Sequence, residues 1–446
     1  MRETARPPCP DALLDYRRAD CYDAVRMAKK ATFLDTEETH ELPAKYHNRI
    51  VDWQKKYFPE LDFLHKNWEK HYRHEAFRLV AKLGPLKQDT IEVGRLAGKS
   101  KFTKAAALDD EMIVQSAKII KAQCSTELGS IQQHRGSINK AQDPGQQFDV
   151  LRVMAEEFRH AYQMMFVLAN DDWSKVGKDI AGETMDSLLS METGQHVLDA
   201  FNLFFDSFVD NCTFTSIIDR VGKYQLEMQT VFSYAPMARS MGPMLAEEAF
   251  HMASGVNAVR KWAYDASRGD GNVSVPFLQK HINKWVPRGL EMFGDERGGK
   301  SALEFGFKDL LNGDAMGRYY EEMKVELIDT LNFEILRARE PKTTREEAPK
   351  IADRVLASGD AWKGVGRDDL VFLPSEKFYR RRGLHEFQTY GVHGQKFAKV
   401  EEYLAHLRSV LPEAYVSGPD FKTYLGNLKA KLAGKEVHEE GLPFYG

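Results

Sequence analysis

Two segments of helical character each carry a glutamate followed three residues later by a histidine. Glu157 and His160 lie in MAEEFRHAYQ, and Glu248 and His251 lie in MLAEEAFHM. Residues at this spacing share one face of a helix, one turn apart. One such pair indicates little, because pairs at this spacing are common on exposed helix surfaces. Two pairs in one helical chain are instead typical of a di-iron or di-manganese carboxylate site inside a helix bundle.

That architecture needs one further carboxylate from each of two other helices, and the spacing selects two candidates. Glu127 stands 30 residues before Glu157, and Asp219 stands 29 residues before Glu248. Two antiparallel helices with about 15 residues per arm would bring each of these carboxylates level with its Glu-x-x-His pair. The chain therefore contains two similar halves with three ligands each. The predicted metal ligands are Glu127, Glu157, His160, Asp219, Glu248 and His251.

These ligand types suit iron and dioxygen. Carboxylates can bridge two metals and neutralise their charge, and imidazoles complete the coordination of each iron. Such a mixed set with an open coordination face can bind and reduce dioxygen. Gln123 lies one turn before Glu127 on the same helix face. We predict it as a catalytic polar residue near the irons, and an ordinary polar helix position would explain it equally well.

Other carboxylates compete for these places. Glu156 and Glu247 directly precede the predicted ligands, but neither has a histidine three residues on. We therefore expect them in solvent or behind the ligands. Three further acids would give helical hairpins with unequal arms and rank lower: Glu111 for the first helix, and Asp206 or Asp210 for the third.

Two groups of neighbouring residues allow more than one interpretation. Arg220 and Lys223, beside Asp219, either pair with Glu156 or Glu247 behind the ligands or lie on the surface. The aromatic and methionine residues near the ligands are expected mostly in the core, with some lining a substrate pocket. They are Phe158, Phe201, Phe204, Phe205, Met164, Met165 and Met244.

Helical periodicity extends from about residue 60 to residue 335. Long helices joined by short turns predict an all-α protein built around a helix bundle. The polar segment 339–350 predicts a boundary, so we divide the chain into an N-terminal helical extension (1–75), the bundle (76–338) and a C-terminal mixed extension (339–446). The longest periodic stretches include 109–123, 148–169 and 185–210, and turn-type segments fall near 140–147, 170–179 and 267–274.

Composition excludes several classes of protein. The 446 residues carry a formal net charge of −4, whereas a nucleic-acid-binding surface would need a basic excess. No stretch reaches the roughly 18 apolar residues of a membrane span, and the N-terminus lacks the apolar segment of a secretory signal. The four cysteines, at positions 9, 21, 124 and 212, do not have the spacing of a zinc or iron–sulfur site. We expect a cytoplasmic protein with reduced thiols and no membrane or nucleic-acid partner.

The motifs around the predicted ligands resemble a known family. The resemblance is closest over 119–135 (IIKAQCSTELGSIQQHR), 156–160 (EEFRH) and 215–255. In particular, the third carboxylate is Asp219 rather than a glutamate, and it stands in an I-x-D-R-x-G-K-x-Q-L context. This motif is similar to the one in the oxygenase subunits of benzoyl-coenzyme A 2,3-epoxidases. Those subunits are ferritin-like di-iron carboxylate oxygenases. The resemblance covers roughly residues 80–260 and is looser elsewhere.

The resemblance implies a ferritin-like four-helix core and a centre of two irons. It assigns one iron to Glu127, Glu157 and His160 and the other to Asp219, Glu248 and His251, with the glutamates sharing the bridging, and it matches Gln123 to a family glutamine. It also implies a di-iron monooxygenase that inserts one atom of dioxygen into the aromatic ring of an acyl-coenzyme A, giving an epoxide. Electrons would come from a separate NADPH-dependent flavin and iron–sulfur reductase.

The substrate is less constrained than the metal chemistry. A related di-iron oxygenase acting on an arylamine, a phenylacetyl thioester or a free aromatic acid remains open, as does a ferritin-like iron-binding protein without catalysis. A structural helical protein with fortuitous acids is a third alternative. Lys377 and the YRRRG segment at 379–383 could bind the phosphates of coenzyme A, or form a solvated basic loop.

Overall fold

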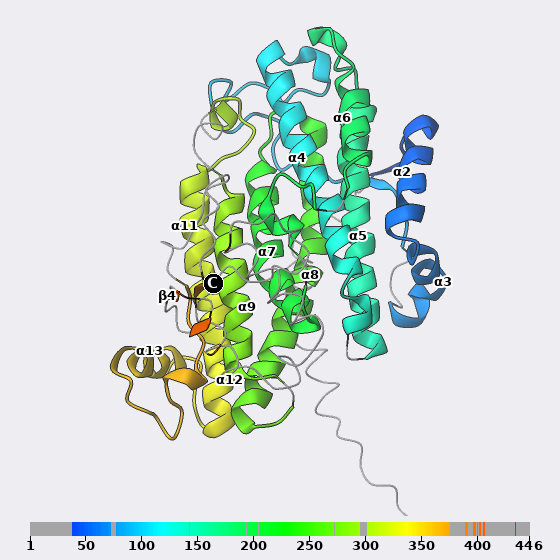
Figure 1. Ribbon diagram of the computed structural model, residues 1–446. Coiled ribbons are helices and arrows are strands. Elements are labelled where there is room, and N and C mark those ends of the chain that lie inside the picture. The colour runs from blue at the N-terminus through cyan, green and yellow to red at the C-terminus, as the bar shows by residue number, and fades with distance from the viewer. Residues whose placement is uncertain are drawn as a thin grey trace, which may run out of the picture.

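The computed structural model describes most of the chain from residue 38 onward (Figure 1). Phe204, Lys377, the YRRRG segment and most of the chain beyond residue 374 lie outside the described residues. The longer described ranges are 38–72, 77–141, 143–192, 194–203, 205–271, 273–294 and 301–374.

The predicted all-α class is confirmed. Strands are few among the described residues: β1 (Glu38–His40) pairs antiparallel with β2 (Ala81–Leu83), and β3 (Thr389–Tyr390) pairs with β4 (Lys396–Phe397). No helix within these described ranges is long and apolar enough to cross a membrane.

Four long helices form the centre of the molecule. They are α4 (Asp110–Arg135), α5 (Pro144–Ala169), α7 (Phe208–Gln229) and α8 (Ala235–Arg268). Helix α4 packs along α5, α7 packs along α8, and α5 contacts α8, so the two predicted hairpins lie side by side (Figure 1). The bundle predicted from the sequence is therefore present, and its kinship with ferritins stays a prediction.

Side-chain caps set where three of these helices begin. The side chains of Asp109, Asp143 and Ser207 each accept a hydrogen bond from a backbone N–H in the first turn of α4, α5 and α7. Such caps satisfy N–H groups that have no partner inside the helix. The starting points matter because they fix the height at which each predicted ligand enters the bundle.

Further helices surround this core. Helix α9 packs on α7, α12 packs on α8, and α6 packs on α4 and α5. One continuous set of buried apolar residues extends from Leu42 to Val371, and the division into three regions stays a prediction. The remaining helices are α2 (Ala44–Tyr57), α3 (Leu61–His71), α6 (Ile180–Leu189), α9 (Val275–Met292), α11 (Asn312–Glu322), the π-helix η6 (Met323–Asp329), α12 (Thr330–Arg339) and α13 (Ala348–Ser358), with 3-10 turns at Ala105–Ala107, Ile138–Lys140, Ser174–Val176, Asp199–Asn202 and Arg367–Asp369.

The periodic stretch 185–210 is not a continuous helix, and here the prediction is wrong. Helix α6 ends at Leu189, Gly194 adopts a left-handed conformation with φ of 84°, and α7 begins only at Phe208. Between them, the Asn202 side chain accepts from the backbone N–H of His196 and donates to its carbonyl. Side chains thus replace the helical hydrogen bonds in this segment, and apolar periodicity could not reveal it.

Helices α7 and α8 touch backbone to backbone one turn from the predicted ligands. A Cβ atom on Gly255 of α8 would lie 2.1 Å from Thr215 Oγ1 and 2.6 Å from the Cys212 carbonyl oxygen. We expect Gly255→Ala to push the helices apart and to lower the free energy of unfolding by about 1–3 kcal/mol. Chemical denaturation would measure the change in the free energy of unfolding.

Gly317 provides the matched control. It lies in α11, and a Cβ there would meet nothing within 4 Å, so Gly317→Ala should raise stability by roughly 0.5–1 kcal/mol. An equal change in the free energy of unfolding in both variants would show that stability does not depend on the close approach of α7 and α8.

Candidate metal centre

The four central helices bring all six predicted ligands together. Helix α4 contributes Glu127, α5 contributes Glu157 and His160, α7 contributes Asp219, and α8 contributes Glu248 and His251; all six side chains are buried. Potential ligand atoms of Glu127, Glu157, His160 and Glu248 lie within 4.8 Å of one another, and so do those of Glu157, Asp219 and His251. Glu157 belongs to both groups, so the two sets of donors form one continuous cluster.

Two glutamates lie between the two imidazoles. Oxygens of Glu157 lie 3.6 Å from His160 Nδ1 and 3.9 Å from His251 Nδ1. Oxygens of Glu248 lie 3.6 Å and 3.4 Å from the same two nitrogens. Glu157 and Glu248 therefore occupy the positions from which a carboxylate could bridge two metal ions.

Five buried polar atoms at this point have no hydrogen-bond partner among the described residues. They are His160 Nδ1, His251 Nδ1, Glu157 Oε2, Asp219 Oδ2 and Glu248 Oε2. Buried polar atoms are almost always hydrogen-bonded, so five such atoms in one cluster call for a common partner. All can present lone pairs, and a mixed oxygen and nitrogen donor set suits iron or manganese. The residues present therefore fit a metal centre.

The electrostatics of the cluster also favour cations. Burial and the neighbouring Glu127 raise the pKa of Glu157 well above its usual range. Burial and Glu248 likewise raise the pKa of Asp219. Two divalent ions would bring as much positive charge as the four carboxylates of the ligand set carry negative charge. A bound cation would stabilise the ionised forms of Glu157 and Asp219 and so lower their pKa values again.

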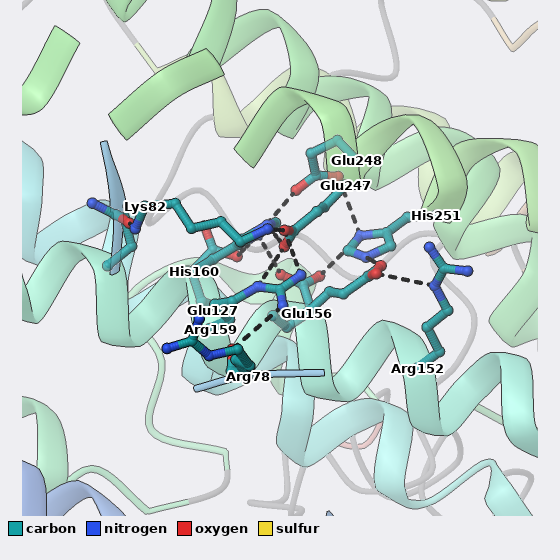
Figure 2. A network of polar contacts seen from close by, with 12 residues as sticks. Arg78, Lys82, Glu127, Arg152, Glu156, Arg159, His160, Glu247, Glu248 and His251 are labelled. Carbon is teal, nitrogen blue, oxygen red and sulfur yellow. Dashed lines mark hydrogen bonds and ion pairs between the residues drawn. The ribbon is translucent and has the colours of Figure 1, made fainter. Parts of the chain in front are cut away.

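The flanking glutamates hold the histidines from behind. His160 Nε2 lies 3.1 Å from Glu247 Oε2, and His251 Nε2 lies 3.1 Å from Glu156 Oε2 (Figure 2). Each glutamate thus orients the imidazole of the opposite helix, and each Nδ1 is turned toward the carboxylate cluster. Carboxylates commonly play this part behind metal-binding histidines, where they fix the tautomer. Both glutamates are buried, so their alternative placement in solvent is wrong.

Basic side chains also bind the two supporting glutamates. Arg159 and Lys82 bind Glu247, and Arg152 donates to Glu156 at 3.0 Å (Figure 2). Although burial raises the pKa of Glu247, Arg159 and His160 hold it well below its usual range. Glu247 is therefore ionised and can support a proton on His160 Nε2.

Arg220 and Lys223 do not pair with these glutamates, which corrects one interpretation of the sequence. Both bind Glu322 of α11 instead, and Tyr224 donates to the same carboxylate at 2.8 Å. Arg220 points away from the ligand cluster, because successive helical residues differ in direction by about 100°. Lys223 lies one turn along α7 from Asp219 and reaches the same Glu322. Sequence proximity to Asp219 was therefore misleading.

Glu247→Gln tests the support behind His160. We expect iron affinity to fall by about 10–100-fold, as for other carboxylates behind metal-binding histidines, because the neutral amide no longer supports the imidazole. Competition with a chelator would measure the affinity. Glu334→Gln is the matched control, because Glu334 is also buried and accepts from Arg260 at 2.8 Å, away from the cluster. Unchanged affinity in the Glu247 variant, or an equal loss in both, would contradict the assignment.

Two polar side chains support the carboxylates. Gln123 donates to Glu127 Oε1, which places it beside the cluster as the sequence suggested. Ser130 donates to Glu157 Oε1 at 3.0 Å and is buried. Sequence spacing gave no signal for Ser130, because a serine three residues after a glutamate in α4 is unremarkable until α5 is seen beside it.

The rival acids lie elsewhere. Glu111 is exposed in the first turn of α4. Asp206 and Asp210 form a separate cluster with His281 of α9. The structure places none of these three acids with the two histidines. The predicted apolar surroundings are confirmed as core for the described members Phe158, Phe201, Phe205, Met164, Met165 and Met244, and Cys124 and Cys212 are buried free thiols.

Comparison with known proteins supports the resemblance seen in the sequence. The chain is 25% identical over 293 residues to benzoyl-CoA oxygenase component B of Aromatoleum evansii, an alignment that covers 60% of this chain and 62% of the relative. The chain thus matches less than two thirds of that relative's length. No protein-family model matches the chain. The predicted resemblance to a component of a benzoyl-CoA oxygenase is confirmed, at modest identity.

Proposed function

We propose that this protein is the oxygenase subunit of a di-iron monooxygenase that oxidises an aromatic acyl-coenzyme A such as benzoyl-coenzyme A. The observation that supports this most strongly is the convergence of five unsatisfied ligand atoms between four helices. The metals would be iron, held by Glu127, Glu157, His160, Asp219, Glu248 and His251.

The contacts of these residues define their tasks in the reaction. Glu156 and Glu247 hold the histidines so that both Nδ1 atoms face the carboxylate cluster, where the irons would bind. Glu157 and Glu248, which lie between the two histidines, would help to hold both irons, while Gln123 donates its amide to Glu127. The surrounding buried apolar residues exclude bulk water from the reacting groups. The bound irons would supply the electrons that reduce dioxygen, so that one oxygen atom enters the aromatic ring as an epoxide and the other leaves as water.

The substrate and the electron donor rest on the relative. Its name describes a component that acts on benzoyl-CoA, and a component implies a partner. We propose a separate NADPH-dependent flavin and iron–sulfur reductase as that partner. A related oxygenase for an arylamine, a phenylacetyl thioester or a free aromatic acid would use the same metal residues.

Labelled dioxygen tests this function. The iron-loaded, chemically reduced protein is mixed with ¹⁸O₂ and, in separate reactions, with benzoyl-coenzyme A, a phenylacetyl thioester or an arylamine, and each compound is analysed by mass spectrometry. We expect one ¹⁸O atom in benzoyl-coenzyme A and none with protein lacking iron. Label in an arylamine or phenylacetyl thioester alone would overturn the benzoyl assignment. Bound iron that oxidises without labelling any of these compounds would indicate an iron-binding protein without oxygenase activity.

A further inference from the structure

A tryptophan and a tyrosine of α2 lead from the ligand helix α5 to the surface. Trp53 stacks on Phe158, which directly follows the predicted ligand Glu157, with ring centroids 6.0 Å apart and planes 10° apart. Tyr57 lies one turn further along α2, with its ring 4.9 Å from that of Trp53. Figure 1 shows α2 lying beside α5 on the outside of the bundle. The aromatic series Phe158, Trp53, Tyr57 therefore connects the buried cluster with solvent.

Burial changes along this series. Phe158 is fully buried, Trp53 is 4% exposed, and Tyr57 is partly exposed. Only α5 separates Trp53 from the ligand cluster, and a helix with its side chains is about 10–12 Å across. Single electrons cross such a distance readily in proteins.

The hydrogen bonds of the two residues differ in a way that favours oxidation at Tyr57. The Tyr57 hydroxyl donates to Glu192 Oε2 at 2.6 Å, so a carboxylate stands ready to take its proton. Trp53 Nε1 has no acceptor among the described residues. An oxidised Trp53 would keep its proton and remain a strong oxidant. An oxidised Tyr57 could pass its proton to Glu192, so the oxidising equivalent would come to rest on Tyr57.

We propose that Trp53 and Tyr57 carry an oxidising equivalent from the metal centre to the surface when no substrate consumes it. This inference rests on the proposed di-iron function. Trp53 gives one electron to the oxidised centre and takes one from Tyr57, whose hydroxyl proton passes to Glu192. A one-electron donor in solution, such as a thiol or ascorbate, then reduces the Tyr57 phenoxyl, and the proton returns from Glu192. The pair would protect the ligands from oxidation during uncoupled turnover.

Trp68 of helix α3 and Tyr72, the residue directly after that helix, form a comparable pair that serves as an internal control. Trp68 and Tyr72 also lie one turn apart, with ring centroids 4.7 Å apart, and Tyr72 lies 6.4 Å from Phe250, the neighbour of His251. Here, however, the Arg152 guanidinium lies 5.8 Å from the Trp68 ring and 4.8 Å from the Tyr72 ring. On α2, Lys56 Nζ lies 4.5 Å from the Tyr57 ring, but no cation of the described residues lies over the Trp53 ring. Removal of an electron from the tryptophan is therefore disfavoured in the pair Trp68 and Tyr72 alone, so that pair should remain reduced.

Radical spectroscopy separates the two pairs. Iron-loaded, reduced full-length protein is mixed with dioxygen without substrate, frozen at intervals and examined by electron paramagnetic resonance, with deuterated tyrosine to identify the radical. We expect a tyrosyl signal that Trp53→Phe lowers at least fivefold and that Trp68→Phe leaves unchanged. Tyr57→Phe should replace it with a tryptophan signal, which also tests the route without altering Trp53.

Peptide mass spectrometry after repeated uncoupled turnover gives an independent measurement. Oxidised products should accumulate at Trp53 and Tyr57 rather than at Trp68 and Tyr72. Wild-type signal in the Trp53 and Tyr57 variants, or an absent radical although the iron is oxidised, would refute the route and leave the proposed function standing. Failure of the protein to bind iron, or of its iron to react with dioxygen, would refute both.

Discussion

Glu157→Gln is expected to abolish tight binding of both irons. Glu157 belongs to both groups of ligand atoms and lies within 4 Å of both histidine Nδ1 atoms. Replacing a carboxylate behind a metal ligand costs about 10–100-fold in affinity, and losing a ligand that both irons of the proposed centre would share should cost more. We therefore expect less than one iron per chain and no detectable oxygenation. Metal analysis and the ¹⁸O₂ assay would measure both.

The same variant should behave in the opposite way without metal. Because the pKa of Glu157 in the folded protein is raised above its usual 4.5 by burial and by Glu127, the folded state resists ionisation of this group more than the unfolded chain does. Glu157 therefore lowers the stability of the metal-free protein as the pH rises above about 4.5. Glutamine removes this penalty, so metal-free Glu157→Gln should be more stable than the wild type at pH 7.

Thermal unfolding of both forms, with and without iron, distinguishes this account from a structural role. A variant that loses stability equally in both forms would show that Glu157 holds the helices together rather than a metal. Ser130→Ala is a useful companion, because it removes only the hydrogen bond to Glu157 and should weaken iron binding to a smaller degree.

Asp210→Ala should produce the largest loss of stability away from the metal centre. Asp210 is fully buried and accepts from Lys284 Nζ at 2.6 Å and from Trp285 Nε1 at 2.6 Å. Its removal would leave the buried Lys284 without its carboxylate, and breaking a buried ion pair in this way costs about 3–5 kcal/mol. Denaturant unfolding would measure the loss.

The pH dependence of this ion pair has a definite sign. Although burial raises the pKa of Asp210, Lys284 and His281 hold it well below its usual 3.8. Its contribution is therefore fully present above about pH 3.8 and is lost as the pH falls below that value. The Asp210→Ala variant should show less acid sensitivity in that range than the wild type.

An exposed pair and the iron content serve as controls for Asp210. Asp265→Ala removes the partner of Lys261 on the surface of α8, and such pairs contribute about 0–1 kcal/mol. Folded Asp210→Ala protein should still bind two irons. Loss of iron at full stability would show instead that Asp210, one of the rival acids, is a ligand.

The sequence predicted the parts of the fold that follow from spacing along one helical hairpin. Glu127 and Glu157 meet because 30 residues suffice for two arms and a turn, and the same reasoning holds for Asp219 and Glu248. The separation of 185–210 into α6, a loop and α7 was missed, because Asn202 replaces helical hydrogen bonds with side-chain ones.

The contacts between the two hairpins could not be predicted from the sequence. Glu156 supports His251, and Glu247 supports His160, only because α5 and α8 face each other. No spacing within one hairpin specifies such a crossed arrangement. The same holds for Asp210, whose partner Lys284 lies 74 residues further along, on α9. The buried polar residues of α9 gave no periodic signal of their own.

Titration of metal-free protein with Fe(II) under anaerobic conditions, followed by Mössbauer spectroscopy after oxidation, tests the central claim most directly. The account predicts two irons per chain that are magnetically coupled, with both lost in Glu157→Gln. Binding of a single iron, of two uncoupled irons, or of none would contradict it.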